Sequence, residues 1–229
     1  MFMSEIEPGL LFTEKYILFF DMKRSRIVRF IKYLSTLVVI VFISILVPVS
    51  TSKYKGYVNG TVLQFENAER YRIARMNLAE EINIYLNKLG SDFPVDTLIN
   101  ECLRRDKIDI AMTIAQGELE SGMGTRGRAL KTQSVWGVGA WDNADHSKSI
   151  SYKNYSESLK AYINLIENRY MPADGTHVDL LNEFVDLNGG RYASDPNYEK
   201  KLINRYNYIN LTTKIDSLQK ECRKYKNHR

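Results

Sequence analysis

Residues 114–124 read Ile114-Ala115-Gln116-Gly117-Glu118-Leu119-Glu120-Ser121-Gly122-Met123-Gly124, and this stretch decides more about the fold than any other. Its apolar start predicts a helix that ends at Glu120, where two nearby glycines turn the chain. A carboxylate at the carbonyl end of a helix is disfavoured in its charged form, and partial desolvation raises its pKa further. Such a group holds a proton near neutral pH, as the general acid of glycosidic cleavage must. The alternative is a surface Glu before an ordinary glycine C-cap, and the segment alone favours that alternative.

Three further blocks follow in order and reverse this preference. They are Val135-Trp136-Gly137-Val138, then Tyr152-Lys153-Asn154-Tyr155-Ser156-Glu157-Ser158-Leu159-Lys160-Ala161-Tyr162, then Arg191-Tyr192-Ala193-Ser194-Asp195-Pro196-Asn197-Tyr198 with Lys201-Leu202-Ile203. With residues 115–124, these blocks resemble the signature of the bacterial glucosaminidase family, glycoside hydrolase family seventy-three, which includes peptidoglycan autolysins. Each block alone is a weak signal, whereas four in the right order across residues 106–210 make a specific match.

The resemblance implies a mainly α fold, lysozyme-like in the α+β sense, with a helical catalytic domain and a small loop or β lobe. It also implies an endo-β-N-acetylglucosaminidase that cuts the β-1,4 bonds of peptidoglycan glycan strands without a cofactor. Glu120 is the expected general acid, and Tyr192 is implied to lie near the cleaved bond, where its phenol stabilises positive charge or holds a water. Substrate contacts are expected from Ser121, Gly122, Trp136, Gly137 and Trp141.

Neighbouring residues receive structural interpretations. Trp136 is expected in the core or the pocket wall and Trp141 in a more exposed place, since aromatic faces bind sugars by apolar contact. Glu118 is two residues before Glu120, so it points to another side of the helix and is interpreted as a solvent-facing charge. Asp195, before Pro196, is expected to cap a turn or the next helix.

The chain departs from the family pattern in three places. Met123 replaces a Trp, Gln133-Ser134 replaces paired asparagines, and the short stretch between Trp141 and Tyr152 lacks the Thr-x-Glu-Tyr that often supplies a second carboxylate in the family. The nearby acids that remain are Asp142 and Asp145. The sequence therefore leaves open whether a second carboxylate, the substrate acetamido group or a muramic 6-hydroxyl attacks the sugar. It also leaves open a muramidase or lytic transglycosylase, and a wall-binding or assembly module with weak or no catalysis.

The composition bounds the partners. The 229-residue chain has a net charge of +5, with Lys and Arg spread along it and no nucleic-acid motif, so a nucleic-acid partner is not expected. The two cysteines, Cys102 and Cys222, are interpreted as separate thiols. The three histidines are scattered without metal-ligand spacing, and no metal is predicted.

Residues 34–49 carry no charge and follow a basic cluster of Lys23, Arg24, Arg26, Arg29 and Lys32. This pattern predicts a membrane or signal segment that places the following domain outside the cytoplasm, in the periplasm or wall, or secreted after cleavage. The expected segments are a basic 1–33, an anchor or signal at 34–52, a linker and helical stalk at 53–95, the glucosaminidase-like domain at 96–210 and a basic helix or tail at 211–229.

Periodicity predicts the helices. Residues 61–89 form a helix that is either a stalk or packed on the domain, and a second helix begins at Asp96 as N-cap and runs to Arg105. Asp109 is expected to cap the helix 110–120. Residues 125–152 are interpreted as loop with a small hairpin, and further helices are expected at 156–170, 177–187 and 197–222.

Overall fold

The computed structural model describes residues 33–34, 37–38, 51–139 and 150–226. It divides into two compact units, 1–60 and 61–229, of which the second contains the elements discussed below. In the described part of the chain, no helix combines the length and the apolar character that a membrane span requires. The predicted segment 34–49 lies outside the described residues except at 34, 37 and 38, so it stays a prediction.

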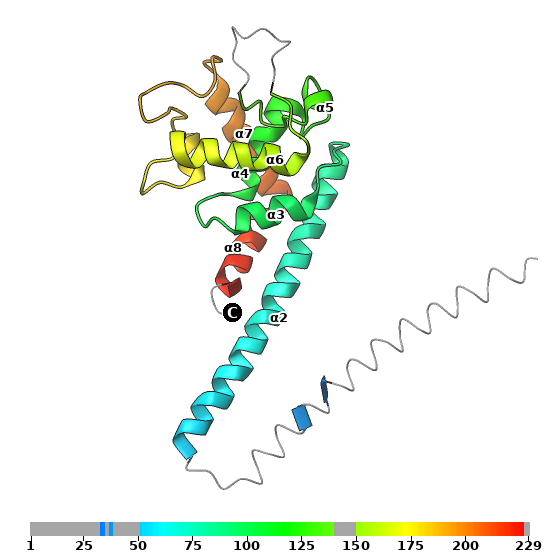
Figure 1. The fold of residues 1–229 in the computed structure, drawn as a ribbon, viewed down its shortest axis with the longest axis vertical. Coiled ribbons are helices and arrows are strands. Elements are labelled where there is room, and N and C mark those ends of the chain that lie inside the picture. The colour runs from blue at the N-terminus through cyan, green and yellow to red at the C-terminus, as the bar shows by residue number, and fades with distance from the viewer. Residues whose placement is uncertain (1–32, 35–36, 39–50, 140–149, 227–229) are drawn as a thin grey trace, which may run out of the picture. The chain divides into compact units, whose positions relative to one another are not determined.

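The second unit is built from helices (Figure 1). Its elements are α2 (Thr51–Lys88, beginning in the first unit), α3 (Val95–Leu103), α4 (Ile110–Ser121), α5 (Ala129–Thr132), α6 (Tyr155–Leu165), the π-helix η2 (Ile166–Tyr170), the 3₁₀-helix η3 (His177–Leu181), α7 (Tyr198–Thr212) and α8 (Ile215–Lys226). Among the described residues the β structure is one isolated bridge between Val185 and Arg191. A mainly helical domain is thus confirmed, and the described part of 125–152 contains α5 and turns instead of a hairpin.

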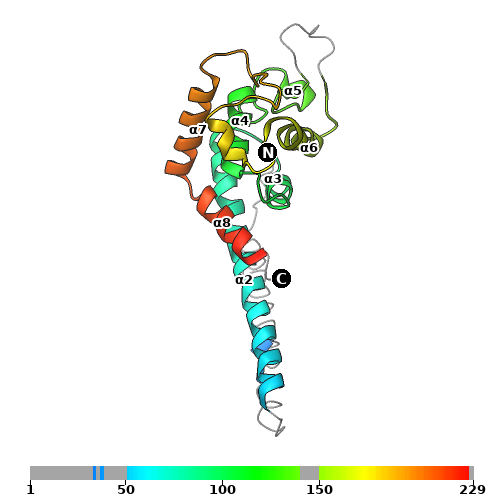
Figure 2. The same cartoon turned by 90° about the vertical axis from the view of Figure 1, so that its left-hand side faces the viewer.

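Helix α4 is the central element, with α6 on one side and α7 on the other (Figure 2). It is mostly buried because its residues are small or apolar almost all round. Asp109 caps its start as predicted, since the Asp109 side chain accepts a hydrogen bond of 2.7 Å from the backbone nitrogen of Met112. The capped start and buried length hold the far end of α4, which bears Glu120, in a fixed place.

Three other helix predictions are wrong. In place of the helix expected at 177–187, the structure has the short 3₁₀-helix η3, which ends at Leu181. Helix α3 begins at Val95 after Pro94, which puts Asp96 inside the first turn instead of at the cap. The single helix expected at 197–222 is divided at Thr213, whose backbone is extended. The Thr213 hydroxyl accepts a hydrogen bond from the backbone nitrogen of Ile215, so one residue ends α7 and satisfies the first backbone N–H of α8.

Helix α2 packs on the domain along its later turns, which settles the choice that the sequence left open. Its inward face buries Ala74, Leu78, Ile82, Tyr85 and Leu86. The helix ends just before Gly90, whose φ of 69° is the left-handed conformation of a helix stop.

Helix α8 is also part of the fold and not a loose tail. Gln219, which is buried, accepts a 2.8 Å hydrogen bond from the backbone nitrogen of Ile110 and donates a 2.9 Å bond to the carbonyl oxygen of Ile108. Ile215, Leu218 and Cys222 pack into the core beside it. Cys102 and Cys222 are both buried free thiols, as predicted.

We therefore expect Gln219→Leu to lower the free energy of unfolding by about 1–3 kcal/mol, because it leaves the buried Ile110 N–H without an acceptor. Urea unfolding followed by circular dichroism measures the change. Gln64→Leu, at an exposed position of α2, is the matched control and should unfold like the unmodified protein. Equal stability of all three proteins would show that α8 does not hold the start of α4.

Candidate active site

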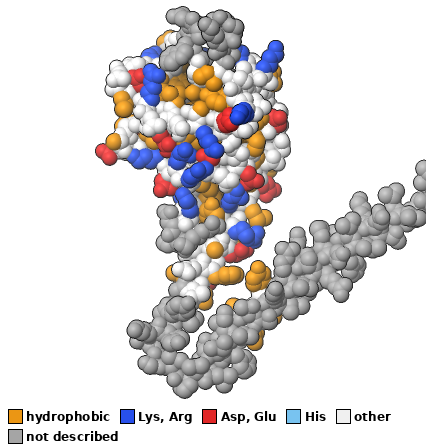
Figure 3. All heavy atoms as spheres, in the orientation of Figure 1, with side chains coloured by type: hydrophobic (Ala, Val, Ile, Leu, Met, Phe, Trp, Pro, Cys, Tyr) orange, Lys and Arg blue, Asp and Glu red, His pale blue; other side chains and the backbone are white. Residues whose placement is uncertain are grey.

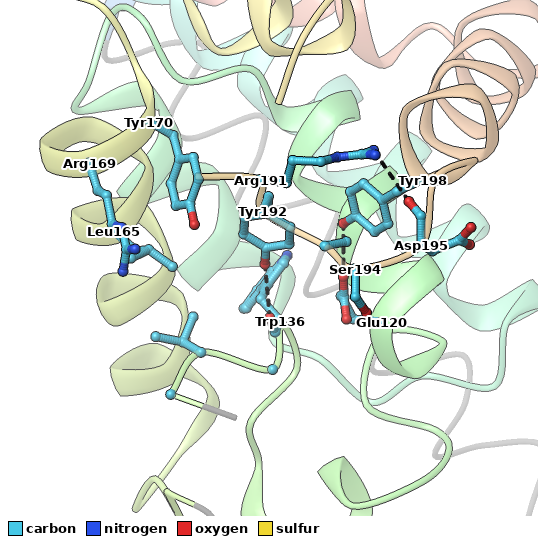
Figure 4. Close-up of a pocket in the computed structure, with 14 residues that line it drawn as sticks. Glu120, Trp136, Leu165, Arg169, Tyr170, Arg191, Tyr192, Ser194, Asp195 and Tyr198 are labelled. Carbon is cyan, nitrogen blue, oxygen red and sulfur yellow. Dashed lines mark hydrogen bonds between the residues drawn. The ribbon is translucent and has the colours of Figure 1, made fainter. Parts of the chain in front are cut away.

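A cleft of about 530 Å³ lies at the C-terminal end of α4 (Figure 4). Its walls come from α4, from residues 136–139, from the α6–η2 junction and from the segment that leads into α7. The lining residues are Glu120, Trp136, Gly137, Val138, Gly139, Leu165, Arg169, Tyr170, Arg191, Tyr192, Ala193, Ser194, Asp195 and Tyr198. Glu120, Trp136, Gly137 and Tyr192 were all predicted as site residues, and the fold brings them together here.

Glu120 is held in this cleft by two neighbours. Its Oε1 accepts a 2.8 Å hydrogen bond from the hydroxyl of Tyr198, at the start of α7. Its Oε2 faces Gly137, where a Cβ would lie only 3.5 Å from that oxygen. Gly137 has a φ of 64°, so a side chain here would be strained and would also narrow the space beside the carboxylate.

Two features of its surroundings shift the pKa of Glu120 in opposite directions. The side chain reaches solvent through the mouth of the cleft, yet protein surrounds it on its other sides, and this desolvation raises the pKa of the carboxyl. The hydrogen bond from Tyr198 lowers the same pKa, but by less. The position at the carbonyl end of α4 disfavours the charged form as well. The balance raises the pKa of a carboxyl that is in contact with the cleft.

Tyr198 is a site residue that the sequence interpretation missed. It was part of the fourth block but received no role, while Tyr192 was taken as the tyrosine next to the cleaved bond. Burial raises the pKa of Tyr198 well above its ordinary value, so its hydroxyl remains a donor to Glu120. The sequence could not indicate that Tyr198 reaches the cleft. It lies six residues after Tyr192, and the turn at 193–197 is what brings both rings to the cleft.

Tyr192 lies in the cleft wall but does not contact Glu120 by a hydrogen bond. Its ring stacks on Phe184 at a centroid distance of 4.4 Å and meets Tyr170 edge-on. Its hydroxyl donates to the backbone oxygen of Trp136 at 3.1 Å. Desolvation raises the pKa of Tyr192 well above the ordinary value, so it stays a neutral phenol.

Trp136 forms the floor of the cleft from inside the core. Its ring is buried, stacks on Tyr162 at 4.9 Å, and donates from Nε1 to the backbone oxygen of Thr113 at 2.9 Å. The indole packs so close to α4 that a Cβ on Gly117 would lie 3.0 Å from Nε1. Of the two expected places for Trp136, core and pocket wall, it occupies both.

Ser121 and Gly122 build the turn after α4 instead of lining the cleft. The buried Ser121 hydroxyl donates to the backbone oxygen of Val135 at 2.8 Å and accepts from the backbone nitrogen of Gly124 at 2.9 Å. Gly122 is the left-handed C-cap, with a φ of 63°. The hydroxyl is engaged by the backbone and both residues are buried, so neither lines the cleft, and their substrate contacts stay a prediction.

Glu118 is a correction to the sequence interpretation. It is buried instead of facing solvent, accepts a 2.7 Å hydrogen bond from the hydroxyl of Tyr85 and forms a 3.0 Å ion pair with Arg205. Helices α2 and α7 cover this side of α4, and no periodicity within α4 itself could indicate that. The carboxylate ties three helices together, and of the two glutamates on this part of α4 it is Glu120 that lines the cleft.

The other charged residues of the lining are paired. Arg169 bonds Asp186, and Arg191 bonds Glu199. Asp195 accepts from the backbone nitrogen of Asn197 and pairs with Lys201, which confirms its predicted capping of a turn. Trp141, Asp142 and Asp145 lie outside the described residues. Over the described ranges, no three side chains of His, Cys, Asp or Glu converge as metal ligands.

Comparison with known families agrees with this geometry. The model of the glucosaminidase family, described as mannosyl-glycoprotein endo-beta-N-acetylglucosaminidase, matches residues 97–211, which is half of the chain. No curated protein and no solved structure matches the chain. The matched region contains α4, the turn at Gly137 and the segment with both tyrosines. The chain therefore belongs to the glucosaminidase family and is a glycoside hydrolase.

Proposed function

We propose that the cleft cleaves β-1,4 bonds of peptidoglycan glycan strands as an endo-β-N-acetylglucosaminidase, with Glu120 as general acid. One observation carries the proposal: within the described part of the chain, Glu120 is the cleft carboxyl that has no ion-pair partner, and its pKa is raised by desolvation. It can give its proton to the glycosidic oxygen as the bond breaks. The same carboxylate then takes a proton from the water that completes hydrolysis.

The rest of the lining suits a glycan. Hydrophobic side chains gather on the upper part of the visible face of the domain, with charged side chains around them (Figure 3). In the cleft, the aromatic side chains Tyr170, Tyr192 and Tyr198 supply apolar surface for sugar rings, and Arg169 and Arg191 supply hydrogen-bond donors at its edge. A helix that carries its acid into a cleft against a separate loop segment also supports a lysozyme-like architecture.

The nucleophile is the next question for this chemistry. Asp195, the other carboxylate of the described lining, is tied to Lys201 and to a backbone N–H, and both contacts lower its pKa. These contacts engage the carboxylate as a turn cap and keep it ionised and paired, which makes it a poor nucleophile. We therefore favour attack by the acetamido oxygen of the substrate on its own anomeric carbon, followed by water.

The N-terminal segment is the basis for the cellular location that we propose. The uncharged stretch 34–49 after a basic cluster supports export, with the domain on the extracytoplasmic side of a membrane or secreted. This location would give the cleft access to the wall.

Wall cleavage is tested by a gel that contains peptidoglycan, with mass analysis of the released fragments. We expect clearing of the gel and new reducing ends at N-acetylglucosamine. Reducing muramic ends would indicate a muramidase, and 1,6-anhydro muramic ends a lytic transglycosylase. A folded protein that binds the wall without releasing fragments would indicate a binding module.

In the same assay, Glu120→Gln should lower cleavage at least about 100-fold, because the amide has nearly the same shape but cannot donate the proton. Glu183→Gln is the matched control, since Glu183 is exposed and outside the cleft lining. Asp142→Asn and Asp145→Asn should have mild effects. A severe loss in either of these two would replace the acetamido route with a second carboxylate.

Tyr198→Phe should move the alkaline limb of kcat/KM to higher pH. The Tyr198 hydrogen bond lowers the pKa of Glu120, so removing it raises that pKa and keeps the acid protonated further into the alkaline range. The measurement is a pH profile on a soluble glycan fragment. Tyr192→Phe, which removes no hydrogen bond to Glu120, should leave the midpoint of that limb in place. A downward shift for Tyr198→Phe would contradict the role of Glu120 as the acid.

Export is tested by fusing residues 1–60 to a reporter enzyme that works only outside the cytoplasm, with the junction after Gly60. We expect an active reporter. An inactive reporter together with a cytosolic fusion protein would refute the proposed location without bearing on the chemistry of the cleft.

A further inference from the structure

The hydroxyl of Tyr170 is a polar group of the cleft that the proposed chemistry leaves unused. Of the three tyrosines in the lining, Tyr192 donates to the Trp136 carbonyl and Tyr198 donates to Glu120. Within the described ranges the Tyr170 hydroxyl has no hydrogen-bond partner, although the residue is only 6% exposed. Figure 4 shows this hydroxyl pointing into the cleft on the side of Tyr192 that lies away from Glu120. A nearly buried donor that points into a cleft without a protein acceptor indicates a ligand group that bonds to it.

The local helix geometry is what turns Tyr170 toward the cleft. In the π-helix η2, the Met171 N–H donates to the carbonyl oxygen of Ile166, five residues earlier, at 2.9 Å. In an α-helix, residues five apart lie about 140° apart around the axis. A π-turn holds about one more residue, so it brings Tyr170 onto nearly the same side as Leu165. Single π-turns are frequent at functional sites, and this one adds a phenol to the cleft wall beside an aliphatic side chain.

The ring of Tyr170 is fixed by its neighbours. It meets Phe184 and Tyr192 edge-on, each at a centroid distance of 5.3 Å. The guanidinium of Arg169, which pairs with Asp186, lies over the ring at 5.6 Å from the centroid. Desolvation raises the pKa of the phenol, so it keeps its proton at neutral pH. A ligand that accepts this proton in a hydrogen bond therefore meets a donor that is already held in place, and little side-chain freedom is lost on binding.

The surroundings of the hydroxyl select the kind of group that fits. Leu165, which Figure 4 shows near Tyr170, and Val138 are half-buried aliphatic residues of the lining. An acetamido group matches both features, because its carbonyl oxygen accepts a hydrogen bond and its methyl favours apolar contact. A sugar hydroxyl would leave the aliphatic surface uncovered. A carboxylate would require a cation, and Arg169 already pairs with Asp186.

We propose that Tyr170 and Leu165 form a subsite for the acetamido group of a second sugar, at the end of the cleft opposite Glu120. The Tyr170 hydroxyl donates to the acetamido oxygen, and the acetamido methyl packs on Leu165. Both sugars of the peptidoglycan repeat carry an acetamido group, so the subsite selects N-acetylated strands and helps to fix their register over Glu120. The identity of the strand rests on the proposed function, whereas the acetamido contact can be measured without cleavage.

The hydrogen bond is tested by the binding of two soluble tetrasaccharides to the full-length protein with Glu120→Gln, which should stop turnover. Chitotetraose carries an acetamido group on each sugar, and cellotetraose carries a hydroxyl in its place. Adding Tyr170→Phe should weaken chitotetraose binding about fivefold, as expected for one lost hydrogen bond, and cellotetraose binding less than about twofold. Tyr208→Phe, at an exposed position outside the lining, is the matched control and should change neither. Equal losses for both sugars, or no binding of chitotetraose, would overturn the subsite.

The methyl contact is tested in the same complex by nuclear Overhauser effects between the acetamido methyls of chitotetraose and the methyls of Leu165. We expect these effects, and Leu165→Ala, which identifies the signals, should also weaken chitotetraose binding. Effects that reach only the ring protons of the sugars would contradict the proposed contact. This measurement needs no binding of cellotetraose and no variant of Tyr170.

Kinetics separate the subsite from the chemistry. In the active protein, Tyr170→Phe should raise KM on a soluble peptidoglycan fragment about fivefold and change kcat less than about twofold, because the contact lies away from the bond that breaks. A loss in kcat with KM unchanged would overturn the subsite. If the acetamido contact is observed but no glycan is cleaved, the proposed function fails and the subsite stands. If glycan is cleaved and Tyr170→Phe alters neither KM nor binding, the subsite fails and the proposed function stands.

Discussion

The contact between the indole of Trp136 and helix α4 is the constraint on which the cleft depends. At Gly117 the helix has no side chain, and a Cβ there would come within 3.0 Å of the indole nitrogen and 2.6 Å of the Met123 sulfur. The indole can therefore lie flat between α4 and Tyr162 and bond to the Thr113 carbonyl. That position brings the next residue, Gly137, against the Glu120 carboxylate. It also places the Trp136 backbone oxygen where it receives the Tyr192 hydroxyl.

Two carboxylates on one helix receive opposite tasks from their surroundings. Glu118 meets a guanidinium and a phenol and is buried under two helices, so it serves the fold. Glu120 meets a neutral phenol and open cleft, so desolvation is not offset by a cation and the pKa of its carboxyl rises. The two carboxyl groups differ because a nearby positive charge favours ionisation, as at Glu118, whereas desolvation without such a charge opposes ionisation, as at Glu120.

Helices outside the family match hold α4 at both ends. Gln219, on α8, satisfies the backbone at the start of α4, and Tyr85, on α2, bonds to Glu118 near its end. Both contacts join residues far apart in the chain and act on α4 from outside residues 97–211. The rigidity that the proposed general acid Glu120 needs is thus supplied in part by segments that the family pattern does not include.

The sequence by itself determined the elements whose signals are local. The Asp109 cap, the glycine turn after Glu120 and the end of α2 before Gly90 depend on neighbours within a few residues, and all three were predicted correctly. The four blocks indicated which residues belong to the cleft, and Glu120, Trp136, Gly137 and Tyr192 do line it. Tertiary structure decided which tyrosine bonds to Glu120 and that Glu118 is buried. It also decided that α2 and α8 pack on the domain. These features depend on contacts between residues 33 to more than 100 positions apart, as in the Tyr85–Glu118 and Gln219–Ile110 bonds, and hydrophobic periodicity along one helix carries no information about them.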